Sequence, residues 1–268
     1  MSISRQSPNL TELTLDGDDL FAMEGSYQFD HAETSPPHSH PLGHLVHAAQ
    51  GVLSLLTDSG SWIAPSNRIA WVPARFEHSH RAHGRTDMRV VYIHDALASL
   101  LPSTPAVLVA TPLAREAVRA ATAGRGRTDA SLDRLRHVIV DEATTAPEQP
   151  LHLPEPRDPR LRAVADAVAA DLATPQSLAE LGERTGTGAR TLSRLFQAET
   201  GMGYRQWRLQ LRMHRALVLL ANGASVSRAA AECGWATTSQ FIEQFTPLIG
   251  MTPGQYRQTD RVGDVPPL

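Results

Sequence analysis

Half of the histidines of this 268-residue chain, six of twelve, lie between residues 38 and 80. His38, His40 and His44 follow one another at i, i+2 and i+6, a spacing that puts three side chains on one face of an extended segment. His78 follows in a second short run. Neutral imidazoles suit Zn, Ni, Cu, Fe or Co, and four of them would fill a first coordination shell. We therefore expect His38, His40, His44 and His78 to bind a divalent transition metal.

Short strands must position these histidines. Apolar or alternating runs separated by Gly, Pro, Asp and Ser cover residues 43–47, 51–57, 61–63, 68–72 and 88–94. Their close, even spacing predicts a small antiparallel barrel or sandwich. Residues 1–34 have weak periodicity and are expected to form an N-terminal arm with an edge strand over residues 21–29.

The histidine pattern resembles the two signature motifs of the cupin barrel over roughly residues 36–95. His38 and His40 match the His-x-His of the first motif, and His78 matches the single histidine of the second. The resemblance implies one divalent metal inside a cupin-like barrel. Two positions depart from it, because His44 stands where glutamate is usual and Arg75 replaces a glycine. The alternative is a set of polar residues that lines a pocket for an organic ligand.

Other residues of this region have less specific patterns. His47 has the opposite strand parity from His44 and is expected to face outward, whereas His80 and His83 are expected at the surface. Aromatic residues in strands are ordinarily core, but four of them are also candidates for an effector pocket. These are Trp62, Trp71, Phe76 and Tyr92.

Two amphipathic helices should follow the strands. Thr111 can cap a helix that starts at Pro112, and Asp129 can cap a second helix over residues 130–144. Such helices either close one end of the barrel or pair with their twins in a homodimer.

We expect an α+β protein of two domains, with the strands in the first domain and helices alone in the second. Five prolines between residues 146 and 159 predict an interdomain linker. The expected parts are an N-terminal arm, a cupin-like sensor and dimerisation domain with its C-terminal helices, the linker, an all-α domain and a disordered tail. Their ranges are 1–34, 35–145, 146–159, 160–258 and 259–268.

One helical pattern occurs twice between residues 177 and 257. Leu192, Leu195 and Phe196 fall at helical spacing after a glycine-containing turn, and Phe241 and Phe245 repeat the pattern. Each copy predicts a helix-turn-helix, and a long helix is expected between the copies. Two copies indicate DNA binding more specifically than one.

Over residues 160–257 the chain resembles the AraC/XylS family of bacterial transcription regulators. The runs Leu192-Ser-Arg-Leu-Phe, Cys233-Gly-Trp, Ser239-Gln-Phe and Gly250-Met-Thr-Pro-Gly-Gln-Tyr-Arg carry the resemblance. It implies double-stranded DNA as the partner and no enzymatic activity. Cupin-type sensor domains are known companions of this helical pair. We therefore expect a sequence-specific transcriptional regulator whose barrel senses a small molecule or a divalent metal.

The second helix of each helix-turn-helix enters the major groove, so its exposed residues are expected to contact bases. Arg190 and Arg194 lie at i, i+4 and can clamp guanine bidentately or bind a phosphate. Glu243 stands where the family commonly has arginine, and a carboxylate there would accept a hydrogen bond from cytosine N4. Specificity is thus expected to depend mainly on the first copy. The candidate contacts are Arg190, Thr191, Ser193, Arg194, Gln197, Thr237, Thr238, Ser239 and Glu243.

Charge and composition agree with this assignment. The net charge of −3 combines 12 arginines and 18 acidic residues in residues 1–156 with 13 arginines and 10 acidic residues in residues 157–268. The basic excess thus lies where DNA binding is expected. Cys233 is the single cysteine, which excludes an intramolecular disulfide and a cysteine-based zinc finger. With no apolar run of membrane-spanning length and no secretion signal, a cytoplasmic location is expected.

Two other functions remain open from the residues alone. The histidine set also suits a cupin metalloenzyme, a dioxygenase or an isomerase, fused to a DNA-binding module. The second alternative is a dimeric DNA-binding protein that binds no effector and whose barrel serves only for dimerisation.

Overall fold

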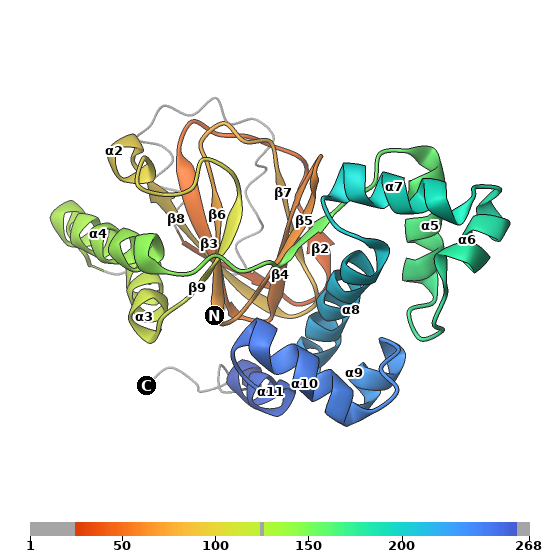
Figure 1. The fold of residues 1–268 in the computed structure, drawn as a ribbon. Coiled ribbons are helices and arrows are strands. Elements are labelled where there is room, and N and C mark those ends of the chain that lie inside the picture. The colour runs from red at the N-terminus through yellow and green to blue at the C-terminus, as the bar shows by residue number, and fades with distance from the viewer. Residues whose placement is uncertain (1–24, 124–125, 262–268) are drawn as a thin grey trace. The chain divides into compact units, whose positions relative to one another are not determined.

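The computed structural model describes residues 25–123 and 126–261. Contacts divide the chain into two compact units. Of the described residues, 25–57 and 62–150 belong to the first unit, and 58–61 and 151–258 belong to the second. A sheet-rich first unit and a helical second unit confirm the predicted fold class (Figure 1). None of the described helices combines the length and the apolar character that crossing a bilayer requires.

Two sheets form the first unit. In one, the strands follow the order β1 (Gly25–Phe29), β8 (Thr86–Ile93), β3 (Gly43–Gln50), β6 (Arg68–Val72) and β9 (Ala106–Val109). In the other, β5 (Gly60–Pro65), β4 (Val52–Thr57), β7 (Ser79–Ala82) and β2 (Glu33–Thr34) are successive neighbours. β1 lies at a sheet edge, as expected for residues 25–29, and the expected residues 21–24 lie outside the described part. The sheets thus include β1 and β2 from the predicted N-terminal arm.

Alternation along β3 decides which of its side chains enter the space between the sheets. His44 lies opposite Tyr92 of β8, and Val46 follows it on the same face. Tyr92 and Val46 share a buried cluster with Leu53 of β4 and Ala82 of β7, which belong to the second sheet. The face of β3 that carries His44 is therefore the interior face.

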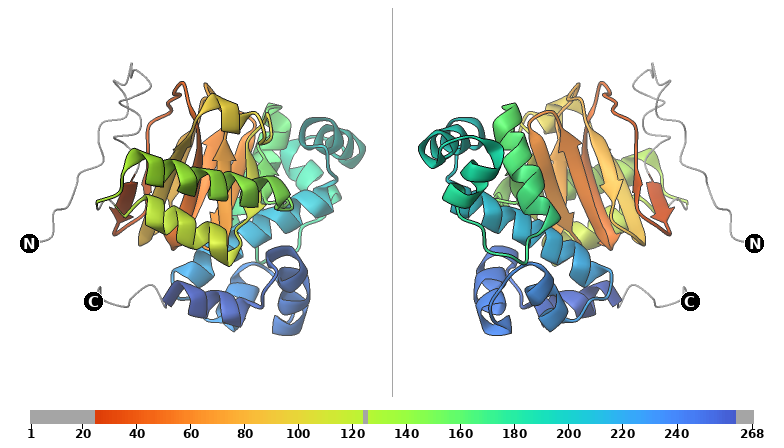
Figure 2. Two further views of the ribbon diagram at one scale, coloured as in Figure 1. Left: turned by 90° about the vertical axis from the view of Figure 1, so that its left-hand side faces the viewer. Right: turned by 90° about the vertical axis from the view of Figure 1, so that its right-hand side faces the viewer.

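Two helices, α3 (Pro112–Ala121) and α4 (Asp129–Thr145), cover the outer face of the first sheet (Figure 2). The Thr111 hydroxyl accepts the Ala114 N–H, which confirms the predicted cap of α3. The cap of α4 is Thr128 and not Asp129, because the Thr128 hydroxyl accepts the Ser131 N–H and Asp129 is already helical. A four-residue helix, α2 (Asp95–Ala98), and β9 lie between β8 and α3.

Seven helices follow in the described part of the second unit. They are α5 (Pro159–Ala170), α6 (Leu178–Thr185), α7 (Ala189–Thr200), α8 (Tyr204–Ala221), α9 (Val226–Glu232), α10 (Thr238–Ile249) and α11 (Pro253–Arg261). The pairs α6–α7 and α9–α10 are the two predicted helix-turn-helix motifs, and the long helix α8 joins them. Ser177 and Glu180 form a capping box at the start of α6, and Ser225 caps α9.

Each helix-turn-helix has its own buried contacts. Phe196 of α7 lies 5.4 Å, centroid to centroid, from both Tyr204 and Trp207 of α8. Phe245 of α10 lies between Phe241 and Tyr256 and makes edge-on ring contacts with both, at centroid distances of 5.3 and 6.0 Å. Such aromatic contacts fix the angle at which each second helix is presented.

Backbone contacts connect the second motif to the end of α5. Gly234, in the turn between α9 and α10, has a φ of 77°, and a Cβ there would lie 2.3 Å from the Leu172 carbonyl oxygen. Only glycine combines that backbone conformation with so close an approach.

Two boundaries differ from the sequence prediction. The proline-rich linker contains the short strand β10 (His152–Pro154), and the Trp207 indole N–H donates to the Pro154 carbonyl oxygen at 3.0 Å. The linker is therefore partly fixed to α8. The predicted tail starts inside a helix, since α11 continues to Arg261, and residues 262–268 lie outside the described part.

Candidate functional site

The two halves of the histidine motif lie side by side because their segments pair as antiparallel strands. The backbones of His38 and His78 exchange two hydrogen bonds of 2.9 Å. The pairing continues on one side to β2 and β7, and on the other to Arg75, whose N–H donates to the His40 carbonyl oxygen at 2.8 Å. Directly opposed residues of such a pair point to the same face. Backbone pairing thus brings together residues that are 40 positions apart.

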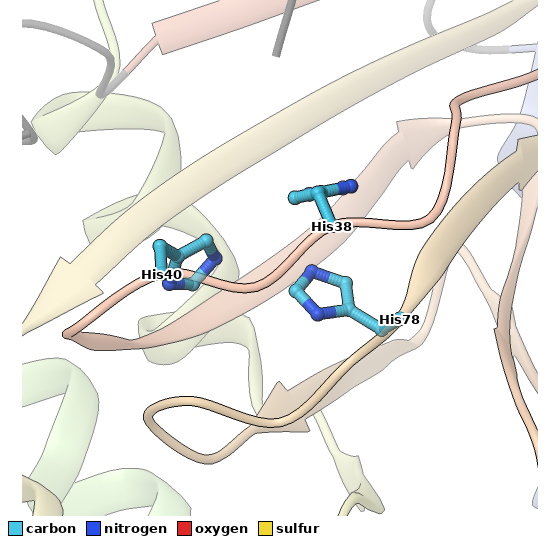
Figure 3. Close-up of side chains that lie close together, drawn as sticks. All are labelled: His38, His40 and His78. Atoms are coloured by element: carbon cyan, nitrogen blue, oxygen red, sulfur yellow. The ribbon is translucent and has the colours of Figure 1, made fainter. Parts of the chain in front are cut away.

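The rings converge as the motif predicts. Ring centroids lie 4.3 Å apart for His38 and His78, 5.2 Å for His40 and His78, and 4.5 Å for His40 and His44. Figure 3 shows His38 and His40 on the segment before β3, and His78 at the start of β7. One detail of the prediction is wrong, because the chain bends at residues 41–42 and His44 is on β3 itself. The bend brings His44 toward the other rings from a separate element.

Backbone carbonyl groups orient three of the imidazoles. The Nδ1–H of His38, His40 and His78 donates to the carbonyl oxygen of Pro36, Leu42 and Phe76, at 2.9, 2.5 and 2.7 Å respectively. Since a carbonyl only accepts, each neutral ring carries its proton on Nδ1 and keeps a lone pair on Nε2. A partner that fixes the tautomer in this way is typical of metal-binding histidines.

The lone pairs point into a shared space. One ligand nitrogen from each of His38, His40 and His78 lies within 4.8 Å of the other two. Nε2 of His40 and Nε2 of His78 are buried without a hydrogen-bond partner, as is Nδ1 of His44. Buried polar atoms are nearly always paired, so Nε2 of His40 and Nε2 of His78 indicate a place for a group that accepts their lone pairs. A divalent ion is such a group.

His80 is a fifth member of the cluster, and its expected surface position is wrong. Its side chain is only 8% exposed, and its Nε2 lies 3.2 Å from Nε2 of His44. The sequence already indicated this burial, because side chains alternate along a strand with a period of two. His80 therefore faces the same way as the buried Ala82 of β7 and as His78 directly before β7. His83 is half-buried and hydrogen-bonded to Ser54 at 2.7 Å.

Burial keeps these imidazoles neutral. Loss of hydration lowers the pKa of His40 from 6.5 to about 4 and that of His78 to about 3. The same burial, with the neighbouring imidazoles as a smaller cause, lowers the pKa of His44 and of His80 well below 6.5. At neutral pH these imidazoles are therefore uncharged, as metal binding requires.

The predicted effector-pocket aromatics lie in different places. Tyr92 faces the interior, with its ring 5.2 Å from His40 and 5.6 Å from His44. Trp71 does not face the interior, because it packs between the first sheet and its helices and donates to the Pro102 carbonyl oxygen at 2.7 Å. Trp62 is buried on β5, and Phe76 is half-buried beside the cluster. Tyr92 is therefore in ring contact with two histidines of the cluster.

His47 lies on the outer face of β3, as its parity predicts, but it is buried there. Its Nδ1–H donates to the Arg68 carbonyl oxygen at 3.0 Å. Burial lowers its pKa to about 4, and the positive charges of Arg119 and Arg115 add to the effect while Asp87 opposes it. It takes no part in the histidine cluster.

The second helix of the first motif, α7, presents a polar face. Leu192 and Phe196 are fully buried, whereas Arg190, Ser193 and Arg194 are exposed. Thr191 is half-buried, and the exposed Gln197 donates to the Gly201 carbonyl oxygen at the end of the helix. The predicted inward and outward residues therefore lie on the expected faces.

The second helix of the second motif, α10, differs in chemistry. Thr237 caps it, because the Thr237 hydroxyl oxygen accepts the Gln240 N–H. Ser239 and Glu243 are exposed and Thr238 is half-buried. The same face carries Ile242, which is 36% exposed. This helix thus presents a carboxylate and an apolar side chain where α7 presents two guanidinium groups.

An internal chain of contacts, which the sequence did not predict, holds the second motif. The Arg212 guanidinium of α8 lies 3.9 Å above the Trp235 ring and donates to the Cys233 carbonyl oxygen at 2.6 Å. The Trp235 indole N–H donates in turn to Gln244 of α10 at 3.0 Å. Cys233 itself is buried, and burial raises the pKa of its thiol to about 12, so it is a core residue and no redox sensor.

Two family models match the chain. Residues 20–192 match an AraC-like ligand binding domain, and residues 181–259 match a helix-turn-helix domain. The two matches together extend from the sheets to α11.

Individual proteins are similar as well. The HTH-type transcriptional regulator NimR of Escherichia coli K12 is 33% identical over 228 residues, which are 83% of this chain and 82% of that protein. The HTH-type transcriptional regulator RipA of Corynebacterium glutamicum is 36% identical over 129 residues, or 48% of this chain and 37% of that protein. A solved structure of the DNA-binding domain of AdpA with a target DNA is 26% identical and covers 41% of this chain and 96% of its own, with a TM-score of 0.36.

Proposed function

This chain belongs to the AraC family of DNA-binding transcriptional regulators, and on that premise we propose that its ligand-binding domain senses a divalent transition metal or a small molecule that binds through such an ion. The matched domains and relatives are those of transcriptional regulators, and the chain is accordingly not an enzyme. The cupin metalloenzyme considered from the histidines alone is thereby set aside.

The observation that supports metal sensing is the convergence of imidazole nitrogens that lack partners. His38, His40 and His78 each hold Nδ1–H on a backbone carbonyl group and leave Nε2 for a common ligand. An organic molecule alone would need hydrogen-bond donors that match several acceptors within 4.8 Å of one another. A single cation matches all of them at once.

The donor set narrows the class of ion. It contains only neutral imidazole, which suits Zn, Ni, Cu, Fe or Co and is unsuited to Mg and Ca. His38, His40 and His78 would hold the ion, and His44, the fourth histidine of the predicted set, lies beside them with its ring 4.5 Å from that of His40. A bound ion with open positions adds a Lewis-acid centre where a small anionic or neutral effector could coordinate.

On the DNA side, we propose that α7 supplies most of the sequence specificity. Arg190 and Arg194 are exposed on one face, at the i, i+4 spacing that two guanidinium groups need to contact adjacent bases or phosphates. Thr191, Ser193 and Gln197 lie around them.

For α10 we propose a different readout. Glu243 is suited to accept from cytosine N4, and the neighbouring exposed Ile242 is suited to contact a thymine methyl group. Thr237, Thr238 and Ser239 at its N-terminus would then contact phosphates and position the helix.

The proposal includes a homodimer. A regulator that binds two DNA half-sites gains affinity when two copies are joined. Sedimentation of the full chain at micromolar concentration tests this, and a monomer in the presence of both metal and DNA would remove the dimer from the proposal.

Elemental analysis of the full chain, purified without an affinity tag, tests metal sensing. We expect about one transition-metal ion per chain in the wild type and loss of that ion in a His78→Ala variant. A wild type without stoichiometric metal, even after incubation with Zn and Co salts, would contradict the proposal. Equal metal content in the two proteins would contradict the assignment of the ligands.

A further inference from the structure

His78 belongs to two sets of three histidines. Its ligand nitrogen lies within 4.8 Å of those of His38 and His40, and also within 4.8 Å of those of His44 and His80. We propose that the second set is a separate, inner ion position, formed by His44, His78 and His80. This inference rests on the proposed metal binding and adds His80, which lies outside the motif that predicted the outer position.

The facing nitrogens of His44 and His80 already have the separation of two ligands of one ion. In a tetrahedral site with metal–nitrogen bonds of about 2.0–2.1 Å, neighbouring ligand nitrogens are about 3.3 Å apart. Nε2 of His44 and Nε2 of His80 are 3.2 Å apart. An ion can therefore replace the hydrogen bond between the two rings with small ring rotations, once the donating ring carries its proton on Nδ1 instead of Nε2.

The third ligand of the inner position is close to both. Ring centroids of His78 lie 5.0 Å from His44 and 4.9 Å from His80. Because His78 and His80 are two residues apart on one segment, they extend from the same face of it. All three side chains of the inner set are buried, whereas His38 of the outer set is half-buried. An ion that enters from solvent thus meets the outer set first.

The two positions exclude each other. Nδ1 of His78 donates to the Phe76 carbonyl oxygen, so only Nε2 of that ring can bind an ion. One lone pair serves one ion at a time. The chain therefore holds one ion, and His78 passes it between the outer and the inner set.

The inner position also has a structural consequence that the outer one lacks. His44 is on β3 of the first sheet, and His80 is on β7 of the second. An ion bound by both cross-links the two sheets from within the barrel, whereas the outer set joins only the paired segments that contain residues 38–40 and 78. Occupation of the inner position is then the state that changes the rigidity of the ligand-binding domain.

Cobalt titration of the full chain separates the two positions. Four variants are needed: His38→Gln, His80→Gln, the double variant His38→Gln/His80→Gln, and His78→Gln. His137→Gln is the matched control, because His137 is an exposed histidine on α4, outside the cluster, whose ring contacts Asp133. The measured quantities are the Co(II) stoichiometry, the dissociation constant and the visible absorption spectrum, with circular dichroism to verify folding.

We expect one Co(II) per chain in the wild type, the control, His38→Gln and His80→Gln, with different visible spectra for the two single variants. In the double variant and in His78→Gln we expect the affinity to fall by more than about 100-fold, beyond the 10- to 100-fold loss that changes outside the ligand set cause.

Two results would overturn the inner position. One is a folded His38→Gln variant that binds no cobalt, which would leave only the outer set. The other is a His80→Gln change that alters neither spectrum nor affinity, in the wild type or in the His38→Gln background. Both results leave the proposed metal sensing intact, whereas a wild type that binds no cobalt at all would refute the metal proposal together with this one.

Discussion

His38 and His78 pair with each other through both of their backbone hydrogen bonds, and this pairing places their rings 4.3 Å apart. Two segments with 40 residues between them thus become one binding surface through main-chain contacts alone. To bind a common ligand, the two side chains then have to point to the same face and carry their protons on Nδ1. Hydrogen bonds to backbone carbonyl groups fix the protons there.

The loop before His78 contains a residue in an unfavourable conformation. Arg75 has a φ of 59°, the left-handed region that glycine prefers. It stands where the resemblance to the second cupin motif predicts a glycine. A glycine at this position removes about 1–2 kcal/mol of backbone strain from the folded state. The same glycine makes the unfolded chain more flexible, which costs a smaller amount of stability, roughly 0.4–1 kcal/mol. Arg75→Gly should therefore stabilise the first unit by about 0.5–1 kcal/mol, measured by urea unfolding of the metal-free protein. Glu77→Gly, at an exposed residue without a positive φ, should destabilise it; a loss of stability in both variants would contradict the strain argument.

The stability of the metal-free protein should decrease in acid through His47. Its folded pKa of about 4 is below the 6.5 of the unfolded chain, so the unfolded state binds more protons between these values. The stabilisation is complete above pH 6.5 and falls by about 1.4 kcal/mol per pH unit for this histidine as the pH drops toward 4. The free energy of unfolding can be measured with urea between pH 7 and pH 4.5, with a chelator present. Its slope against pH should correspond to about one proton fewer taken up on unfolding in His47→Gln than in the wild type. If the free energy of unfolding fell equally with pH in the two proteins, His47 would bind its proton as readily in the folded state as in the unfolded state, which would contradict the prediction.

Arg194 should be a main determinant of operator affinity. Arg194→Ala is expected to cost at least about 1–3 kcal/mol of specific binding at fixed salt. The operator can be selected from a randomised duplex pool, and binding measured by fluorescence anisotropy. Arg184→Ala removes the same charge from an exposed residue of α6 that is bonded to Gln176, and it should have a much smaller effect. Equal losses in the two variants would indicate a general charge effect, and no loss for Arg194→Ala would show that α7 was assigned the wrong face.

Glu243 should select a cytosine in the second half of the operator. Glu243→Gln removes the negative charge at nearly constant size, so the selected cytosine should be lost and non-specific affinity should not decrease. Selection from the same randomised pool measures both effects, with Glu183→Gln, at an exposed residue of α6, as the charge control. If the selected sequence were the same for the wild type and for Glu243→Gln, α10 would not read that base through Glu243.

Local patterns predicted the elements that carry the sites. Leu192, Phe196, Phe241 and Phe245 were placed correctly because helical periodicity and burial have the same cause, the packing of one apolar face. The opposite faces of His44 and His47 followed in the same way from the parity of a strand. These features depend on residues close together in the sequence.

What the sequence did not predict depends on tertiary contacts. The bend at residues 41–42, the burial of His80 against His44, and the cap at Thr128 all require knowledge of a partner or of an exact turn. The strand β10 formed within a proline-rich stretch, where composition alone indicates a linker. Trp71 is an aromatic residue of a strand, and only the position of α3 and α4 shows which face of the sheet it occupies.

The most direct test of the account is the effect of a bound ion on DNA binding. The dissociation constant of the selected operator should be measured with chelator and with saturating zinc, for the wild type, for His78→Gln and for the exposed-histidine control His137→Gln. We expect zinc to change the constant by at least about fivefold in the wild type and in the control, and to have no effect in His78→Gln. A wild-type constant that is the same with and without zinc, in protein shown to hold the ion, would contradict the claim that the histidine cluster controls DNA binding.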